Sequence, residues 1–149
     1  MISTLPLKNQ QFDIILISGE YYDDHPLSPV GVIARVLDSQ SYSIGIIEKP
    51  KTKADFIRLG TPKLFFGITS GTVDSMLYNY TPLKRKRSDD PHLFITEMPE
   101  RAVIFYCNKL REYFPGCLMV IGGVEASLRR FAHYDYWGNK VRKSILLDS

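Results

Sequence analysis

Four short apolar segments recur along the chain, and each is followed by a glycine or by polar residues. They occupy residues 13–18, 43–48, 64–69 and 118–121. In the first of them, four consecutive aliphatic residues precede a serine, a pattern typical of a strand that is buried on both faces of a parallel sheet. The pattern therefore predicts four buried strands.

A helix is predicted to follow the first strand. Ser28 is a suitable helix N-cap, and Pro29 suits the first helical position. Apolar residues then recur at i, i+3, i+4 and i+7 over residues 30–37, which is the spacing of one helix face. Val32 and Val36 add a second apolar side, so we expect this helix to be packed deeply.

Four further helical segments lie between or after the remaining strands. The pattern predicts a helix over 54–59, a helical turn over 74–80, a helix that opens at Pro99 and a helix that begins near Val124. Alternating strands and helices favour a parallel sheet with helices on both faces. We therefore expect residues 1–149 to form one α/β domain, a three-layer Rossmann-like or flavodoxin-like sandwich with its strands in the order 2-1-3-4.

The composition limits the class of protein. The chain has 149 residues, of which 44% are hydrophobic and 23% are charged, as in ordinary globular domains. Its longest purely apolar run, residues 102–107, is far shorter than the ~20 residues that cross a bilayer. Cys107 and Cys117 are too few for a disulfide framework or a cysteine metal cluster, and we expect them to be buried thiols. A cytoplasmic protein without membrane contact is expected.

The positive charge of the chain is local. The formal net charge is +3, and the four residues Lys84 to Arg87 carry all of the excess. They lie within residues 81–98, a stretch without a clear period that predicts a loop. We expect a solvated loop here, and nucleic-acid contact is the least favoured alternative.

Unusual residues follow three of the predicted strands. The carboxyl ends of parallel strands lie at one edge of the sheet, where ligand crevices form. Glycines there let backbone N–H groups approach a ligand, although such loops also need small residues simply to turn. The candidate crevice residues are Asp24 and His25 after the first strand, Ser70, Gly71 and Thr72 after the third, and Gly122, Gly123 and Glu125 after the fourth.

Two of these positions allow more than one interpretation. His25 follows Asp23 and Asp24, so it is either a histidine oriented by a carboxylate or part of a turn rich in Asp and Pro. Glu125 and Arg129 have the i, i+4 spacing that is typical of a stabilising ion pair on a helix surface. No G-x-G-x-x-G, P-loop or G-x-S-x-G motif occurs, and no catalytic residue or metal ligand is predicted.

Arginine and aromatic residues are concentrated after the last predicted strand. Such a segment can stack on a base or cofactor or bind phosphate, and it equally suits an interdomain surface. The candidate residues are Arg129, Arg130, His133, Tyr134, Asp135, Tyr136 and Trp137.

Several motifs give the chain a family resemblance. They include Asp24-His25-Pro26, Leu64-Phe65-Phe66-Gly67, and the long stretch from Gly122-Gly123 through Glu125-Ala126-Ser127-Leu128-Arg129-Arg130 to Ala132-His133-Tyr134-Asp135-Tyr136-Trp137. In these residues the chain resembles the N-terminal domain of the YgiQ-type radical SAM proteins. The resemblance covers nearly the whole chain.

The resemblance implies a cobalamin-binding-like Rossmann fold that precedes a radical SAM barrel. Such a barrel binds S-adenosylmethionine at a [4Fe–4S] cluster held by C-x-x-x-C-x-x-C, a motif that this sequence lacks. We therefore expect a fragment that stops before the last strand of its domain and binds none of these cofactors by itself. Cobalamin-binding domains carry the motif D-x-H-x-x-G. Asp23 and His25 match its first two positions, but Ser28 replaces the glycine, so cobalamin is not expected.

Two functions remain open from the sequence. The first is an accessory domain that packs on a radical SAM barrel, in the same full-length chain or encoded nearby, and helps to form its substrate site. The alternative is a stand-alone Rossmann-like module that binds a small anionic or nucleotide ligand. By itself the chain is not expected to cleave S-adenosylmethionine.

Overall fold

A five-stranded parallel sheet forms the centre of the computed structural model, which describes residues 1–6, 8, 11–89, 98–134, 136–138 and 141–142. Its strands are β1 (Ile2–Ser3), β2 (Ile14–Ser18), β3 (Ile44–Glu48), β4 (Phe65–Thr69) and β5 (Met119–Ile121). They are arranged in the order β1-β3-β2-β4-β5. The four predicted strands and their 2-1-3-4 order are confirmed. The two-residue β1, which is too short to show a period, was not predicted.

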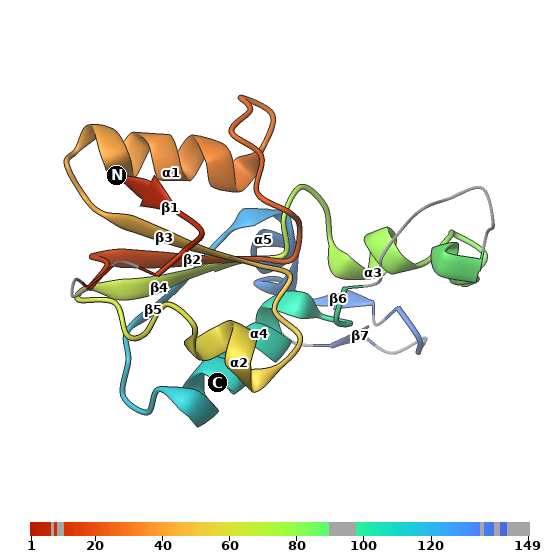
Figure 1. Cartoon of the computed structure of the whole chain (residues 1–149). Helices are drawn as coiled ribbons and strands as arrows, with labels where there is room; N and C mark the ends of the chain where they lie inside the picture. Colours follow the sequence, from red (N-terminus) through yellow and green to blue (C-terminus); the bar gives the residue numbers. More distant parts are fainter. Residues whose placement is uncertain (7, 9–10, 90–97, 135, 139–140, 143–149) are drawn as a thin grey trace.

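Helices cover both faces of the sheet, which confirms the three-layer α/β prediction (Figure 1). On one face, α1 (Pro29–Ser39) packs Val30 and Ala34 against Ile14 and Leu16 of β2. On the other face, Ile15 and Ile17 of β2 belong to a larger apolar cluster. That cluster also contains residues of α2 (Lys53–Ile57) and α4 (Ala102–Tyr113). Every residue of β2 is buried, as a strand enclosed by two helix layers must be.

The N-cap of α1 was predicted correctly, but the extent to which the helix is buried was not. The Ser28 side chain accepts a hydrogen bond from the Gly31 backbone N–H, and Pro29 is the first helical residue. Val32 and Val36, which were expected to be packed deeply, are 44% and 59% exposed. The side of α1 that carries Val30 and Ala34 faces the sheet, and Val32 and Val36 lie away from it.

The remaining elements lie mostly beyond the carboxyl ends of the strands. They are α3 (Ser75–Asn79), the short 3₁₀ helix η1 (Arg87–Asp89), α5 (Gly123–Arg129), and the antiparallel pair β6 (His133–Tyr134) and β7 (Val141–Arg142). The helix expected from Pro99 begins at Ala102, after Arg101 in a left-handed conformation with φ of 51°. The pair β6–β7 was not predicted, because two-residue strands carry no readable alternation. No helix among the described residues is long and apolar enough to cross a membrane.

The N-cap of α1 provides a first test of this fold. Replacing Ser28 with Ala removes the acceptor of the Gly31 N–H and should lower the free energy of unfolding by about 1 kcal/mol. Urea denaturation monitored by circular dichroism measures this change. Ser39→Ala, at the exposed end of the same helix, should change it by less than about 0.5 kcal/mol. Equal stabilities for the two variants would contradict the capping role.

Candidate functional site

The loops that follow β2 and β4 touch each other at the carboxyl edge of the sheet. A Cβ atom added at Gly19 would lie 2.4 Å from the Ser70 carbonyl oxygen, so only glycine fits there. The Glu20 carboxylate crosses to the other loop and accepts hydrogen bonds from the Thr72 N–H at 2.9 Å and the Thr72 hydroxyl at 2.7 Å. The predicted crevice is closed at this point by a carboxylate of the chain itself.

The small residues of these loops make internal contacts. Ser70 is fully buried and its hydroxyl donates to the Val73 carbonyl at 2.9 Å. Gly71 has φ of +113° and its N–H donates to the Thr69 hydroxyl. Gly123 has φ of +87° and lies against the same hydroxyl, so that an added Cβ would lie 2.5 Å from it. The structure thus brings the β4 and β5 loops together, with Gly122 as the N-cap of α5.

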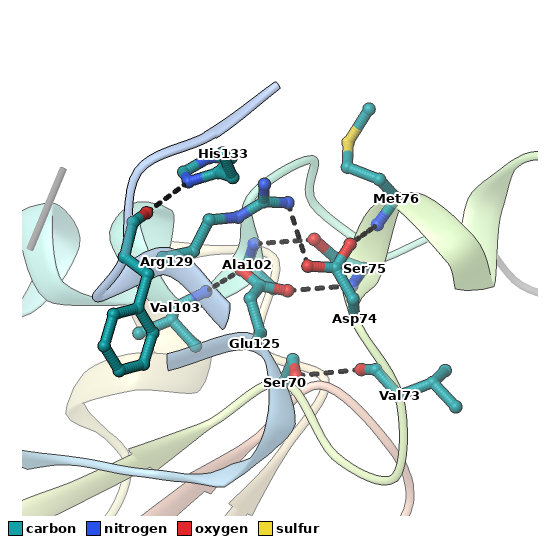
Figure 2. A network of polar contacts seen from close by, with 11 residues as sticks. Ser70, Val73, Asp74, Ser75, Met76, Ala102, Val103, Glu125, Arg129 and His133 are labelled. Atoms are coloured by element: carbon teal, nitrogen blue, oxygen red, sulfur yellow. Dashed lines mark hydrogen bonds and ion pairs between the residues drawn. The ribbon is translucent and has the colours of Figure 1, made fainter. Parts of the chain in front are cut away.

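Glu125 of α5 is the central residue of a buried polar network (Figure 2). One carboxylate oxygen accepts the Ser75 N–H at the start of α3, at 2.8 Å. The other accepts the Val103 N–H in the first turn of α4, at 3.0 Å. N–H groups in the first turn of a helix have no partner within the helix, so this one side chain satisfies a donor from each of two helices. The Ser75 hydroxyl accepts a hydrogen bond from a third backbone donor, the Ala102 N–H.

Arg129 forms a second buried contact beside Glu125. Its Nη2 donates to Asp74 at 2.8 Å, and the side chains of both residues are less than a tenth exposed. The other carboxylate oxygen of Asp74 accepts the Met76 N–H. The expected surface ion pair between Glu125 and Arg129 is therefore wrong. Both side chains are buried because α5 packs against the start of α3 and of α4. Glu125 accepts hydrogen bonds from backbone N–H groups, whereas Arg129 pairs with Asp74.

The two ends of the Arg129–Trp137 stretch are anchored by different contacts. At one end is the Arg129–Asp74 pair. At the other, Tyr136 and Trp137 pack on Tyr80, with ring centroids 5.7 and 4.7 Å from it. The Tyr136 hydroxyl donates to the Thr81 carbonyl, and the Trp137 indole N–H to Glu100. Two of the three predicted aromatic candidates, Tyr136 and Trp137, are thus engaged by their own chain.

Between these anchors lies an open segment, residues 130–134. Phe131 and Tyr134 are 70% and 73% exposed, and Arg130 is also exposed. His133 is half-buried, and its Nδ1 lies 2.8 Å from the Phe131 carbonyl oxygen. Asp135 lies outside the described residues. Arg130 and Tyr134 were predicted as candidates, whereas Phe131 was not, and these three exposed side chains are available to another molecule or domain.

Asp24 and His25 form part of the turn that leads into α1. Asp24 is bound by Arg35 of α1, whose Nε donates at 2.8 Å, and this hydrogen bond lowers the pKa of the carboxyl below its usual value. The His25 Nδ1 accepts the Leu27 N–H at 3.1 Å. The described contacts therefore match the turn interpretation of His25, and Asp24 is paired with an arginine instead.

Three carboxylates that organise this edge were missed as site residues: Glu20, Asp74 and Glu100. Only Asp74 carried a readable signal, since it precedes a helical turn as an N-cap residue does. The partners of Glu20 and Glu100 lie 52 and 37 residues away, at Thr72 and Trp137. Local spacing cannot reveal contacts of that kind.

The two cysteines lie on the α2–α4 side of the sheet. Cys107 is buried in the larger apolar cluster, and Cys117 is half-buried against it. Burial raises the pKa of the Cys107 thiol to about 11 and also raises that of Cys117. Among the described residues, no three His, Cys, Asp or Glu side chains are grouped so as to hold a metal ion.

Comparisons with known proteins agree with the resemblance. Residues 5–149 match the family described as Radical SAM N-terminal, so the chain belongs to that family. A UPF0313 protein of Thermotoga petrophila is 50% identical over 94% of this chain and 26% of its own length. UPF0313 proteins of Methanocella arvoryzae and Clostridium botulinum are 51% and 47% identical, over 92% and 99% of this chain and 24% of their own lengths. The chain spans about a quarter of each relative. No solved structure matches it.

Replacing Glu125 with Gln tests the buried network. The amide NH₂ of Gln would face one of the two backbone N–H donors, which would leave that donor unsatisfied. We expect the free energy of unfolding to fall by about 2–3 kcal/mol, measured by urea denaturation. Glu112→Gln breaks an exposed pair with Lys109 and should cost less than about 1 kcal/mol. A Glu125→Gln variant as stable as this control would rule out the bridging role.

The thiol environments predict ordered alkylation. With a pKa of about 11, only about one Cys107 in a thousand is a thiolate at pH 8. Iodoacetamide should therefore modify Cys117 well before Cys107, as followed by mass spectrometry of tryptic peptides. In denaturant the two rates should converge. Faster modification of Cys107 in the folded protein would show that the thiol is not buried as described.

Proposed function

We propose that this chain is the accessory N-terminal domain of a longer radical SAM protein, in which it packs on the radical SAM region and helps to form its substrate site. The family match and the fourfold greater length of the relatives support a domain that works beside another. The open 130–134 segment is the observation that carries the proposal.

The open segment suits docking because its ends are fixed and its middle is exposed. The Arg129–Asp74 pair holds one end, and the packing of Trp137 on Tyr80 holds the other. Phe131, Tyr134 and Arg130 project between them. Aromatic residues and arginine are enriched at the centres of protein interfaces, where they contribute much of the binding energy. A segment that is ordered before docking also loses less conformational entropy on binding.

The cofactors of such a protein belong to the region beyond this chain in the proposal. There, a [4Fe–4S] cluster would bind S-adenosylmethionine and supply the radical chemistry. The cysteines of this chain do not fit the cluster, since Cys107 is buried on the inner side of α4 and Cys117 lies ten residues away without a third thiol. Cobalamin is not proposed either. Ser28 caps α1 where the cobalamin motif needs glycine, and the His25 Nδ1 is bound to Leu27.

The alternative, a module that binds a small anion, has less support. The backbone N–H of Thr72 is the kind of donor that an anion would use at a strand end. Glu20 already occupies it, and its negative charge opposes a second anion at the same point. We therefore retain the accessory-domain proposal.

Substitutions in the open segment test the proposal. The protein for this test is the extended protein, defined as this chain joined to the part of the Thermotoga petrophila relative that follows its matched region. Replacing both Phe131 and Tyr134 with Ala should raise the rate of proteolysis between the two regions about tenfold, as a loss of about 1.4 kcal/mol of docking energy implies. Release of 5′-deoxyadenosine from S-adenosylmethionine, measured by chromatography, should change in the same variant.

Leu83→Ala is the matched control. Leu83 is 79% exposed, but it lies outside the open segment, in the loop that carries the basic residues Lys84 to Arg87. It should leave both readouts at the level of the unsubstituted extended protein. Unchanged proteolysis and 5′-deoxyadenosine release in the Phe131/Tyr134 variant would overturn the proposal. The same pair of substitutions made at the aligned positions of the relative itself covers the case in which the joined protein does not fold.

A further inference from the structure

The face of the sheet that carries α1 is covered only in part. The strand register places Leu16 of β2, Gly67 of β4 and Val120 of β5 side by side on this face. Val30 and Ala34 of α1 cover the β2 side of this row. At its other end, Val120 is 48% exposed. In the described residues no helix lies over β4 and β5 on this side.

An apolar groove runs between α1 and this uncovered face. Its cavity has a volume of about 190 Å³ and is lined by Ile33 and Leu37 of α1, Phe65 of β4, and Val120 of β5, among others. Ile33 is 46% exposed, so the wall formed by α1 is open as well. Parallel sheets are normally covered by helices on both faces, so an apolar groove in the helix layer is the space for one more helix.

The same side of the molecule carries an open strand edge. The Gly122 N–H donates to Ile68 of β4, so alternation along a parallel strand turns the N–H groups of Met119 and Ile121 away from β4. Within the described part of the chain no strand pairs with that edge of β5. Open parallel sheets of this kind commonly have the order 2-1-3-4-5, and here the fifth position is vacant among the described strands.

We propose that a strand followed by a helix, from the part of the longer protein beyond this domain, completes the sheet: the strand pairs with β5 and the helix fills the groove beside α1. The opposite face of β4 is already occupied, since Phe66 packs on Phe114 at the end of α4 with ring centroids 5.0 Å apart. A helix that follows a fifth strand can therefore pack only on the face of the sheet that carries α1. The relatives carry about three quarters of their length outside the match, which is ample for such a unit.

This inference rests on the proposed function only in that the chain is part of a longer protein. It uses the β5 edge and the α1 groove, whereas the proposed substrate-site role uses residues 130–134. A covalently attached segment also has an effective concentration in the millimolar range, which favours it over a second copy of the chain.

Cysteine labelling tests the groove. Val120→Cys is made together with Cys117→Ser, in this chain alone and in the extended protein, and its reaction with a maleimide is followed at pH 7 by mass spectrometry. Labelling should be at least about ten times slower in the extended protein than in the chain alone. Ile57→Cys is the matched control, because Ile57 is 43% exposed on α2, across the sheet. Its labelling should differ by less than about twofold between the two proteins.

Hydrogen exchange tests the strand separately and needs no substitution. The Met119 and Ile121 amides should exchange at least about ten times more slowly in the extended protein than in the chain alone. If the joined protein does not fold, the same comparison is made between the full-length Thermotoga petrophila relative and a version cut where its match ends.

Three results would overturn the inference. Equal labelling of Val120→Cys in both proteins would show an empty groove, and equal amide exchange would show an unpaired edge. Protection of Val120→Cys in the isolated chain that grows with protein concentration would assign the groove to a second copy. None of these results depends on Phe131 or Tyr134, so the proposed function can stand or fall separately.

Discussion

The Glu125 carboxylate bridges three helices at the carboxyl end of the sheet, and the arrangement of that end depends on it. It projects from α5, yet its hydrogen bonds go to the first turns of α3 and α4. Those two helices are separated in the chain by the long segment that contains the basic loop. Their relative position is therefore fixed by a later element of the chain, and the charge is tolerated in the interior because both of its oxygens accept hydrogen bonds.

Other carboxylates at this edge of the sheet also accept hydrogen bonds from backbone N–H groups. Glu20 accepts the Thr72 N–H, Asp74 accepts the Met76 N–H, and Glu125 accepts two more. In many α/β domains the N–H groups at strand and helix ends bind a ligand's phosphate or carboxylate. Here side chains of the domain satisfy them. These hydrogen bonds join the loops and helices of this edge to one another, and the exposed segment 130–134 begins next to Arg129, which is paired with Asp74.

Sequence patterns predicted the parts of this structure that depend on near neighbours. The buried run of β2 and the Ser28 cap of α1 are local, and both are confirmed. Errors arose where burial is decided by distant partners. Both sides of α1 carry apolar residues, and the sequence pattern does not show which side faces the sheet, so the exposure of Val32 and Val36 could not be predicted. Glu125 and Arg129 have the spacing of a surface pair, and only the packing of α5 on α3 and α4 shows that they are buried.

The open edge of β5 has a consequence for how a longer protein of this kind is made. Synthesis proceeds from the N-terminus at about 5–20 residues per second, and domains fold as they emerge. In the longer protein proposed above, this domain then presents the open edge of β5 and an apolar groove before the next element is made. A strand–helix unit of roughly 30 residues takes a few seconds to follow. During those seconds the β5 edge is of the kind that pairs with other chains, so the order of synthesis itself sets the period in which a wrong pairing can form.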